Sequence, residues 1–253
     1  MLEVKNIAKS FGGLNALTRV SFCVNEGQVK ALIGPNGAGK TTLYNIITGF
    51  EAITTGEVLF CGERIDGLKP HVIAAKGIAR TFQNVELFSS MTVVENVMMG
   101  CHTHTRVGLV ASALRLTSAR RREKAILERA LELLDFVGLT QRAYDNSAGL
   151  PFGLQRHLEI ARALATAPKL LLLDEPASGL DPTESRALGN LICKIRDRGI
   201  TVLLVEHNMD VAMEISDEIV VLNYGTDIAQ GTPRQIQNNP AVISAYLGDD
   251  AYA

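Results

Sequence analysis

The most informative stretch of this 253-residue chain is Val29-Lys30-Ala31-Leu32-Ile33-Gly34-Pro35-Asn36-Gly37-Ala38-Gly39-Lys40-Thr41. An apolar strand pattern leads into G-x-x-x-x-G-K-[ST], and a helix pattern follows from Lys40. The glycines allow a turn whose backbone N–H groups point at phosphate oxygens, and the helix N-terminus adds a partial positive charge. The stretch therefore predicts a triphosphate site, with Lys40 at the β- and γ-phosphates and the Thr41 hydroxyl on Mg²⁺.

A second acidic segment fits the same site. The buried strand pattern Leu170–Leu173 ends in Asp174 and Glu175, where open α/β sheets place their ligands. We expect Asp174 to reach Mg²⁺ through its coordination shell. Glu175 is expected to polarise a water that attacks the γ-phosphate, a role typically worth about 10²- to 10⁴-fold in rate. A Glu directly after the Asp favours hydrolysis over transfer to an organic acceptor.

The composition is that of an ordinary globular chain. Apolar residues make up 47% of it, and the formal net charge of −2 gives no sign of a general nucleic-acid-binding surface. The four cysteines lie far apart without a CxxC pair, which favours a reducing, cytosolic compartment over a disulfide framework or a zinc ribbon. No apolar run approaches the length of a membrane span, and the N-terminus has no signal region. We therefore expect any membrane role to come through a partner.

The order of patterns predicts an interrupted α/β fold. Short strands fill the first sixty residues, at 2–7, 20–24, 29–33 and 56–60. An amphipathic helix is predicted over 123–137, after a basic connector at 102–122. Later helices are predicted at 155–167 and from Asp181, where Pro182 and Glu184 complete a capping box. We predict a nucleotide-binding core at 1–85 and 155–225, a helical insert at 86–154 and a tail at 226–253.

Four further segments complete a resemblance to the ATP-binding cassette (ABC) ATPases over essentially the whole chain. They are Arg80-Thr81-Phe82-Gln83, Leu150-Pro151-Phe152-Gly153-Leu154-Gln155-Arg156, Ser178-Gly179-Leu180-Asp181 and His207. The resemblance implies a P-loop NTPase core with a mainly parallel sheet, an N-terminal antiparallel β subdomain and an inserted α-helical subdomain. Nearly every segment is weak evidence alone, but their order and spacing are shared with the family.

The resemblance also implies site roles. Gln83 contacts Mg²⁺ and the attacking water, and His207 hydrogen-bonds the γ-phosphate, so that both are catalytic with Glu175. The Mg²⁺ ligands are Thr41, Gln83 and Asp174. The residues that contact ATP are Phe11, which stacks on adenine, and Gly34, Pro35, Asn36, Gly37, Ala38, Gly39, Lys40, Thr41 and Thr42. The signature segment that serves the partner's ATP is Leu150, Pro151, Phe152, Gly153, Leu154 and Gln155. The dimer-contact loop is Ser178, Gly179, Leu180 and Asp181.

Several segments narrow the resemblance to the ATP-binding subunit of branched-chain amino acid importers. They include Phe11-Gly12-Gly13-Leu14-Asn15-Ala16, His157-Leu158-Glu159-Ile160-Ala161-Arg162 and Gly231-Thr232-Pro233. This implies ATP and Mg²⁺ as cofactors and a second homologous ATPase, or a second copy of the chain, as partner. It further implies two membrane permeases, an external solute-binding protein reached indirectly, no nucleic acid, and a place on the cytoplasmic face of the inner (cell) membrane. The solute itself stays open, because selectivity resides in the permeases and the binding protein.

The signature segment departs from the family pattern Leu-Ser-Gly-Gly-Gln. Pro151 offers neither a hydroxyl nor a backbone N–H to a phosphate, although Gly153 and the helix N-terminus still can. Importers of this kind often carry such a variant. We hypothesise that the two ATP sites of a heterodimer are unequal.

Other functions remain open from the residues alone. A soluble ABC-type clamp on DNA or ribosomes would share the motifs, although such proteins usually have fused cassettes or long coiled-coil inserts. A GTPase or small kinase lacks an Asn-Lys-x-Asp motif here and leaves Leu150–Arg156 unexplained. The local group Cys101, His102 and His104 is a weak metal-site candidate because a fourth ligand is missing.

Overall fold

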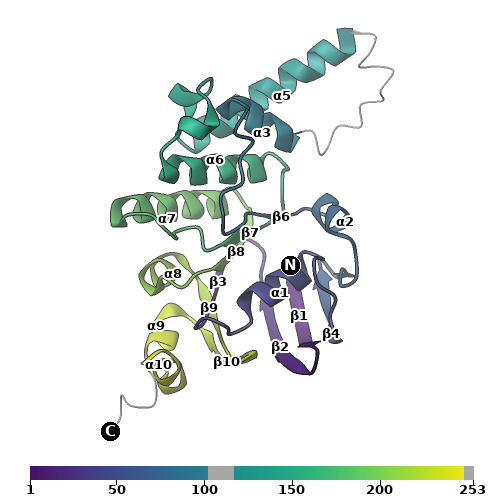
Figure 1. Ribbon diagram of the computed structural model, residues 1–253, viewed down its shortest axis with the longest axis vertical. Helices are drawn as coiled ribbons and strands as arrows, with labels where there is room; N and C mark the ends of the chain where they lie inside the picture. Colours follow the sequence, from purple (N-terminus) through teal and green to yellow (C-terminus); the bar gives the residue numbers. More distant parts are fainter. Residues whose placement is uncertain (102–116, 248–253) are drawn as a thin grey trace. The chain divides into compact units, whose positions relative to one another are not determined.

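The computed structural model describes residues 1–101 and 117–247 and divides the chain into two compact units. The first unit combines residues 1–78 with 169–253, and the second consists of residues 79–168. Figure 1 shows the elements of each along the chain. The boundaries expected from the sequence, after residues 85, 154 and 225, separate an ATP-binding core, a helical insert and a tail. This division stays a prediction.

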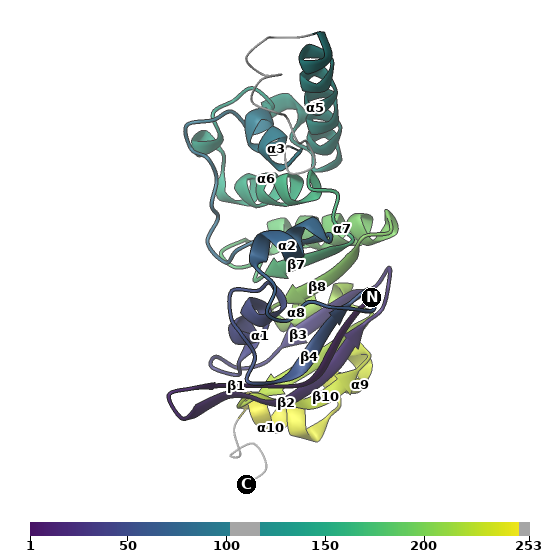
Figure 2. The same ribbon diagram turned by 90° about the vertical axis from the view of Figure 1, so that its right-hand side faces the viewer.

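An antiparallel sheet in the order β2-β1-β4-β5 forms the N-terminal part of the first unit (Figure 2). Its strands are β1 (Leu2–Phe11), β2 (Leu14–Val24), β4 (Thr55–Phe60) and β5 (Glu63–Arg64). Gly12 and Gly13 join β1 to β2 with φ angles of 52° and 93°, which a two-residue hairpin requires. Both strands are longer than the predicted ranges 2–7 and 20–24. Their residues next to the hairpin, 8–11 and 14–16, are half-buried or exposed rather than buried, so apolar alternation does not mark them.

A six-stranded sheet in the order β10-β9-β3-β8-β7-β6 forms the rest of the framework. Its strands are β3 (Val29–Ile33), β6 (Ile78–Arg80), β7 (Leu170–Asp174), β8 (Thr201–Val205), β9 (Glu218–Asn223) and β10 (Thr226–Gly231). Strand β3 pairs in parallel with β8 and β9, and β7 pairs in parallel with β8, whereas β10 is antiparallel to β9. Every residue of β3, β7 and β8 is buried, as parallel strands covered on both faces require. The predicted α/β fold class is confirmed.

The first unit also contains six described helices. They are α1 (Lys40–Ile47), α2 (Pro70–Ala75), α7 (Pro182–Asp197), α8 (Met209–Ile215), α9 (Pro233–Gln237) and α10 (Pro240–Leu247). Helix α1 is anchored by the fully buried Tyr44, whose hydroxyl donates to the Leu203 carbonyl in β8 at 2.6 Å. The predicted capping box at the start of α7 is confirmed, because Asp181 accepts from the Glu184 N–H and Glu184 accepts from the Asp181 N–H.

The second unit is helical. It contains α3 (Val93–Cys101), α5 (Thr117–Phe136), α6 (Phe152–Leu164) and short 3₁₀ turns at Thr140–Arg142 and Ser147–Gly149. Helix α3 packs against both α5 and α6, and a Cβ on Gly100 would lie 2.3 Å from the Arg162 carbonyl oxygen. Helix α5 begins at Thr117 rather than at the predicted residue 123. The described part of its first turns is exposed and charged, so the apolar period starts only at Ile126.

Candidate functional site

The glycine-rich loop between β3 and α1 has a backbone that only glycine accommodates well. Gly34, Gly37 and Gly39 have φ angles of 152°, 80° and 101°. A Cβ on Gly34 would lie 2.1 Å from the Leu222 carbonyl oxygen, and one on Gly39 would lie 2.8 Å from the Ala16 carbonyl oxygen. The loop is therefore packed onto the end of β9 and the start of β2. These two close approaches leave no room for a side chain at Gly34 or Gly39.

The first turn of α1 is suited to an anion. Gly39 is its N-cap in the left-handed conformation, no side chain caps the helix, and no acidic residue stands in the first turn. The backbone N–H groups and the helix dipole are then not neutralised by a carboxylate of the helix itself. Thr41 is exposed in this turn and Thr42 is half-buried. The predicted residues from Gly34 to Thr42 thus run without a break from the end of β3 through the loop into the first turn of α1, and Asn36, Gly37 and Thr41 are the exposed ones.

Lys40 folds back over the loop. Its side-chain nitrogen donates to the carbonyl oxygens of Gly34 at 2.6 Å and Pro35 at 3.0 Å, and only 6% of the residue is exposed. Burial lowers the pKa of Lys40, while the carboxylates of Glu175 and Asp174 oppose that shift. Both predicted acids therefore interact electrostatically with the lysine. A buried cation facing two carboxylates at a glycine-rich turn is an arrangement that binds a triphosphate together with a divalent cation.

The two acids lie at the end of β7, as predicted. Asp174 is the last residue of the strand and is 5% exposed, opposite Val205 of β8. Glu175 follows with a φ of 47°, which is unusual for a non-glycine residue, and its N–H donates to the Val205 carbonyl at 2.9 Å. His207, just after β8, has its Nδ1 3.4 Å from Glu175 Oε2. The structure thus brings the predicted base and the predicted histidine together.

Glu206 is a further residue near the site that the sequence motifs do not indicate. It is fully buried and accepts from the Ala177 N–H at 2.9 Å and the Asn208 N–H at 3.4 Å. Burial raises the pKa of Glu206. It ties the loop after Glu175 to the loop that carries His207, so it positions both predicted catalytic groups. An acid directly after the apolar run Val202–Val205 is the signal that could have indicated it.

Two predicted contacts of the first unit stay predictions. Phe11 is 44% exposed at the end of β1, and the Lys9 side-chain nitrogen lies 4.5 Å from the centre of its ring. This cation–π contact orients the ring, but its stacking on adenine is untested. In the predicted dimer loop Ser178–Asp181, the Asp181 carboxylate is engaged as the cap of α7.

The remaining predicted residues lie in the helical unit. The Gln83 carbonyl accepts a hydrogen bond from the Arg156 guanidinium. In the predicted signature segment, Pro151 is the N-cap of α6 and the Gln155 side chain donates to the Leu150 carbonyl at 2.9 Å. The prediction that this helix spans 155–167 was wrong, since α6 begins at Phe152 and ends at Leu164. A proline fits the cap position at the start of the helix, because that position needs no N–H. At the other end, Ala167 has a non-helical φ of 46°, so the helix does not continue to it.

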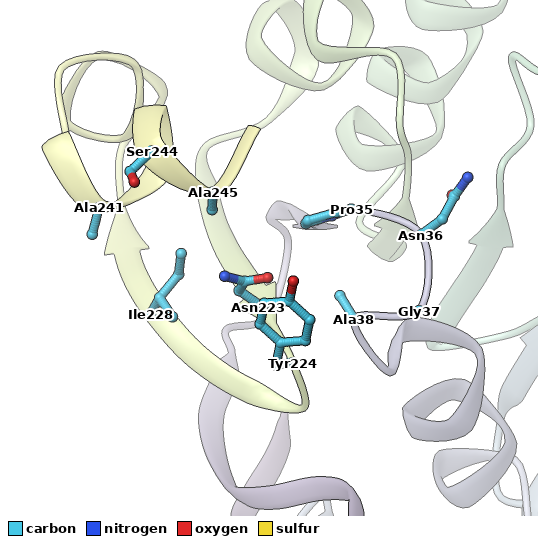
Figure 3. A pocket seen from close by; sticks show the side chains of 10 residues that line it. All are labelled: Pro35, Asn36, Gly37, Ala38, Asn223, Tyr224, Ile228, Ala241, Ser244 and Ala245. Carbon is cyan, nitrogen blue, oxygen red and sulfur yellow. The ribbon is translucent and has the colours of Figure 1, made fainter. Parts of the chain in front are cut away.

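A pocket of about 480 Å³ flanks the phosphate loop on the side of the C-terminal helix. Figure 3 shows α10 contributing one wall and the loop the other, with Asn223 and Tyr224 between them. Its lining residues are Pro35, Asn36, Gly37, Ala38, Asn223, Tyr224, Ile228, Ala241, Ser244 and Ala245. The sequence predicts only a tail at 226–253. In the structure, α10 shares a pocket with the loop proposed to hold phosphate.

Two negative findings apply to residues 1–101 and 117–247 alone. Within them, no group of three or more His, Cys, Asp or Glu side chains is arranged to hold a metal ion. The candidate Cys101–His102–His104 group lies partly outside these ranges, because only Cys101, which is buried, belongs to them. None of the helices described there has the length and apolar character to cross a membrane.

Comparison with known proteins gives matches over nearly the whole chain. A family model described as ABC transporter matches residues 17–178, and one described as branched-chain amino acid ATP-binding cassette transporter matches residues 228–252. The high-affinity branched-chain amino acid transport ATP-binding protein BraF of Pseudomonas aeruginosa is 48% identical over 250 residues, which cover 98% of each chain.

Solved structures agree with these matches. The ADP conformation of an ATP-binding cassette from an ABC transporter is 34% identical with a TM-score of 0.86, covering 98% of this chain and 99% of that one. A bacterial ABC transporter cassette solved as a dimer is 28% identical with a TM-score of 0.78, covering 92% of this chain and 99% of that one. The similarity extends from the β subdomain to the C-terminal helices.

Proposed function

The chain belongs to the ABC transporter family, and from this we propose that it is the ATP-hydrolysing subunit of an importer for branched-chain amino acids. The family match and the relative's name support the resemblance stated from the sequence. The observation that carries the proposal is the phosphate loop, where the buried Lys40 folds over the carbonyls of Gly34 and Pro35 and interacts electrostatically with Asp174 and Glu175.

Each residue has a distinct part in the proposed reaction. The loop amides and the start of α1 bind the phosphates of ATP, and Lys40 leaves the carbonyls of Gly34 and Pro35 to pair with the β- and γ-phosphates. Glu175 accepts a proton from the water that attacks the γ-phosphate. His207, whose Nδ1 lies 3.4 Å from Glu175 Oε2, orients that carboxylate and hydrogen-bonds the γ-phosphate.

The residues at this site fit a magnesium ion. Mg²⁺ prefers hard oxygen ligands, and the exposed Thr41 hydroxyl and the Asp174 carboxylate provide them at the end of the sheet. Gln83, from the helical unit, is the third ligand we propose. When bound, the ion would neutralise charge on the phosphate oxygens.

Assembly follows from the same residues. We infer that a second ABC ATPase, either a homologue or a second copy, completes the site with its own signature segment, as the solved dimeric cassette suggests. Pro151 cannot donate a backbone N–H, so we infer that this chain's α6 serves the partner's ATP less well than the usual signature does. Two membrane permeases, fed by an external solute-binding protein, would hold the pair at the cytoplasmic face of the membrane.

The test of the ATPase uses the assembled transporter. Glu175→Gln is expected to bind ATP with unchanged affinity and to lower turnover about 10²- to 10⁴-fold. Glu26→Gln, the same change of charge at an exposed turn, serves as the control and should turn over normally. Normal hydrolysis by Glu175→Gln would contradict the assignment of the base.

The solute is tested separately. Proteoliposomes that contain the permeases and this chain are supplied with the binding protein on the opposite side of the membrane. They are expected to transport radiolabelled leucine only when ATP is present on the side where the ATPase lies. Uptake of another solute instead would overturn the branched-chain assignment and leave the ATPase assignment intact.

The proposed inequality of the two ATP sites has its own test. ATP trapping is compared between the Glu175→Gln complex and the complex that carries the corresponding variant of the partner. Equal trapping in the two complexes would contradict the inequality.

A further inference from the structure

A buried ion pair on α6 is not used by the proposed reaction. Arg156 and Glu159 lie one turn apart, with Arg156 Nη1 3.1 Å from Glu159 Oε2. Their side chains are only 2% and 3% exposed. A buried pair is weak evidence for stability by itself, because desolvation of both charges offsets their attraction. Its other contacts therefore have to explain it.

Those contacts are made with Phe82 and Gln83, two consecutive residues of the segment Arg80–Gln83, which we call the Gln83 segment. Glu159 Oε1 accepts from the Phe82 N–H at 3.2 Å, and Arg156 Nη1 donates to the Phe82 carbonyl at 3.0 Å. Arg156 Nη2 donates to the Gln83 carbonyl. Each of these bonds has a charged partner, which makes it stronger than a neutral one. Together they hold the peptide groups on both sides of Phe82 and the carbonyl of Gln83.

The same guanidinium also touches the signature segment. The Arg156 guanidinium carbon lies 5.4 Å from the centre of the Phe152 ring, at the first residue of α6. Phe152 stands where the family pattern has glycine, so this contact depends on the variant signature. One side chain thus contacts both the Gln83 segment and the helix start.

We propose that Arg156 and Glu159 are positioning residues that lock the Gln83 segment to the start of α6, so that the two segments move as one body. The inference rests on the proposed function, in which Gln83 serves this chain's ATP and the signature segment serves the partner's ATP. If the Gln83 segment and the start of α6 move together, ATP binding at one site changes the position of the segment that serves the other site. The pair would then contribute to turnover and to cooperativity between sites rather than to ATP affinity.

The test compares this pair with an exposed pair of the same spacing in the same unit. Arg156→Lys and Glu159→Gln are the test variants, and Arg129→Lys and Glu132→Gln, whose charged groups lie 3.0 Å apart on α5, are the controls. In the assembled transporter, the test variants are expected to lower kcat about 10- to 100-fold, as loss of an orienting partner typically does. They should also raise the Mg²⁺ concentration for half-maximal rate and lower the Hill coefficient for ATP, with the Kd for ATP within about twofold. The control variants should change none of these.

Two further measurements separate positioning from a general structural effect. Amide hydrogen exchange of the peptide that contains Phe82 should be faster in Glu159→Gln, because its N–H loses a charged acceptor. In a double-mutant cycle with Gln83→Ala, Arg156→Lys should add little further loss of kcat, since both act through Gln83. If Glu159→Gln fails to fold, Arg156→Lys carries the test alone.

The outcomes that overturn the inference are distinct from those that overturn the function. Unchanged kcat and Hill coefficient in Arg156→Lys, or fully additive losses in the cycle, would refute the positioning role while wild-type hydrolysis persists. Absence of ATP hydrolysis in the wild-type complex would instead refute the proposed function.

Discussion

Replacement of Gly34 by alanine tests whether the phosphate loop is shaped by its contact with β9. The new Cβ would lie 2.1 Å from the Leu222 carbonyl oxygen and 3.2 Å from the Ala38 Cβ. The first of these is a backbone atom in a strand that pairs with both β3 and β10, so no side-chain rotation relieves the overlap. The φ of 152° adds strain, because alanine rarely adopts it.

The expected loss of unfolding free energy follows from these two effects. Backbone strain at such a φ costs about 1–3 kcal/mol, and overpacking costs about 1–3 kcal/mol more, giving roughly 2–6 kcal/mol for Gly34→Ala. Gly37→Ala is the matched control, because Gly37 also has a positive φ, of 80°, but its Cβ would meet nothing within 4 Å. It should lose only about 1–2 kcal/mol.

Urea unfolding followed by far-UV circular dichroism measures the difference, since the chain contains no tryptophan to report by fluorescence. We expect Gly34→Ala to unfold at the lower urea concentration, with unchanged m-values in both variants. Equal destabilisation of the two variants would refute the argument that the contact with Leu222 shapes the loop.

Three further predictions concern charges at the site. Lys40→Ala should weaken ATP binding about 10- to 100-fold in isothermal titration calorimetry, because a charge-assisted contact is worth about 1.5–3 kcal/mol; unchanged affinity would contradict the role of Lys40. His207→Ala should slow ATP hydrolysis severely in a phosphate-release assay without loss of ATP affinity, and a normal rate would remove His207 from the mechanism. Burial raises the pKa of Glu206 above its ordinary 4.5, so the folded chain holds this proton more tightly and the free energy of unfolding falls as pH rises from 4.5 to the raised pKa. Urea titrations across this range should show that slope reduced in Glu206→Gln, and identical slopes would contradict it.

The sequence predicts the phosphate loop, the acid pair and the fold class because each depends on local pattern. The strand–loop–helix order around Gly34 and the carboxylates after Leu173 are readable without tertiary knowledge. The capping box at Asp181 is likewise complete within four residues. The matching family model and the transport ATP-binding protein among the relatives agree with the resemblance stated from the motifs.

What the sequence does not predict depends on contacts between distant segments. Glu159 meets the N–H of Phe82, 77 positions away, and Glu206 meets the N–H of Ala177, 29 positions away. On a helix, Glu159 has the appearance of an ordinary charged residue, and only the fold shows that it is buried. Similarly, helix α6 starts earlier than its predicted residue 155 because Pro151 serves as a cap, which spacing alone does not reveal.

At position 175, the residue that best suits the backbone differs from the residue that the proposed reaction requires. With a φ of 47°, a glutamate there is strained by about 1–2 kcal/mol relative to glycine. A library selected only for survival on heating should therefore enrich glycine at position 175. It would return sturdier proteins that no longer have the carboxylate proposed to activate water.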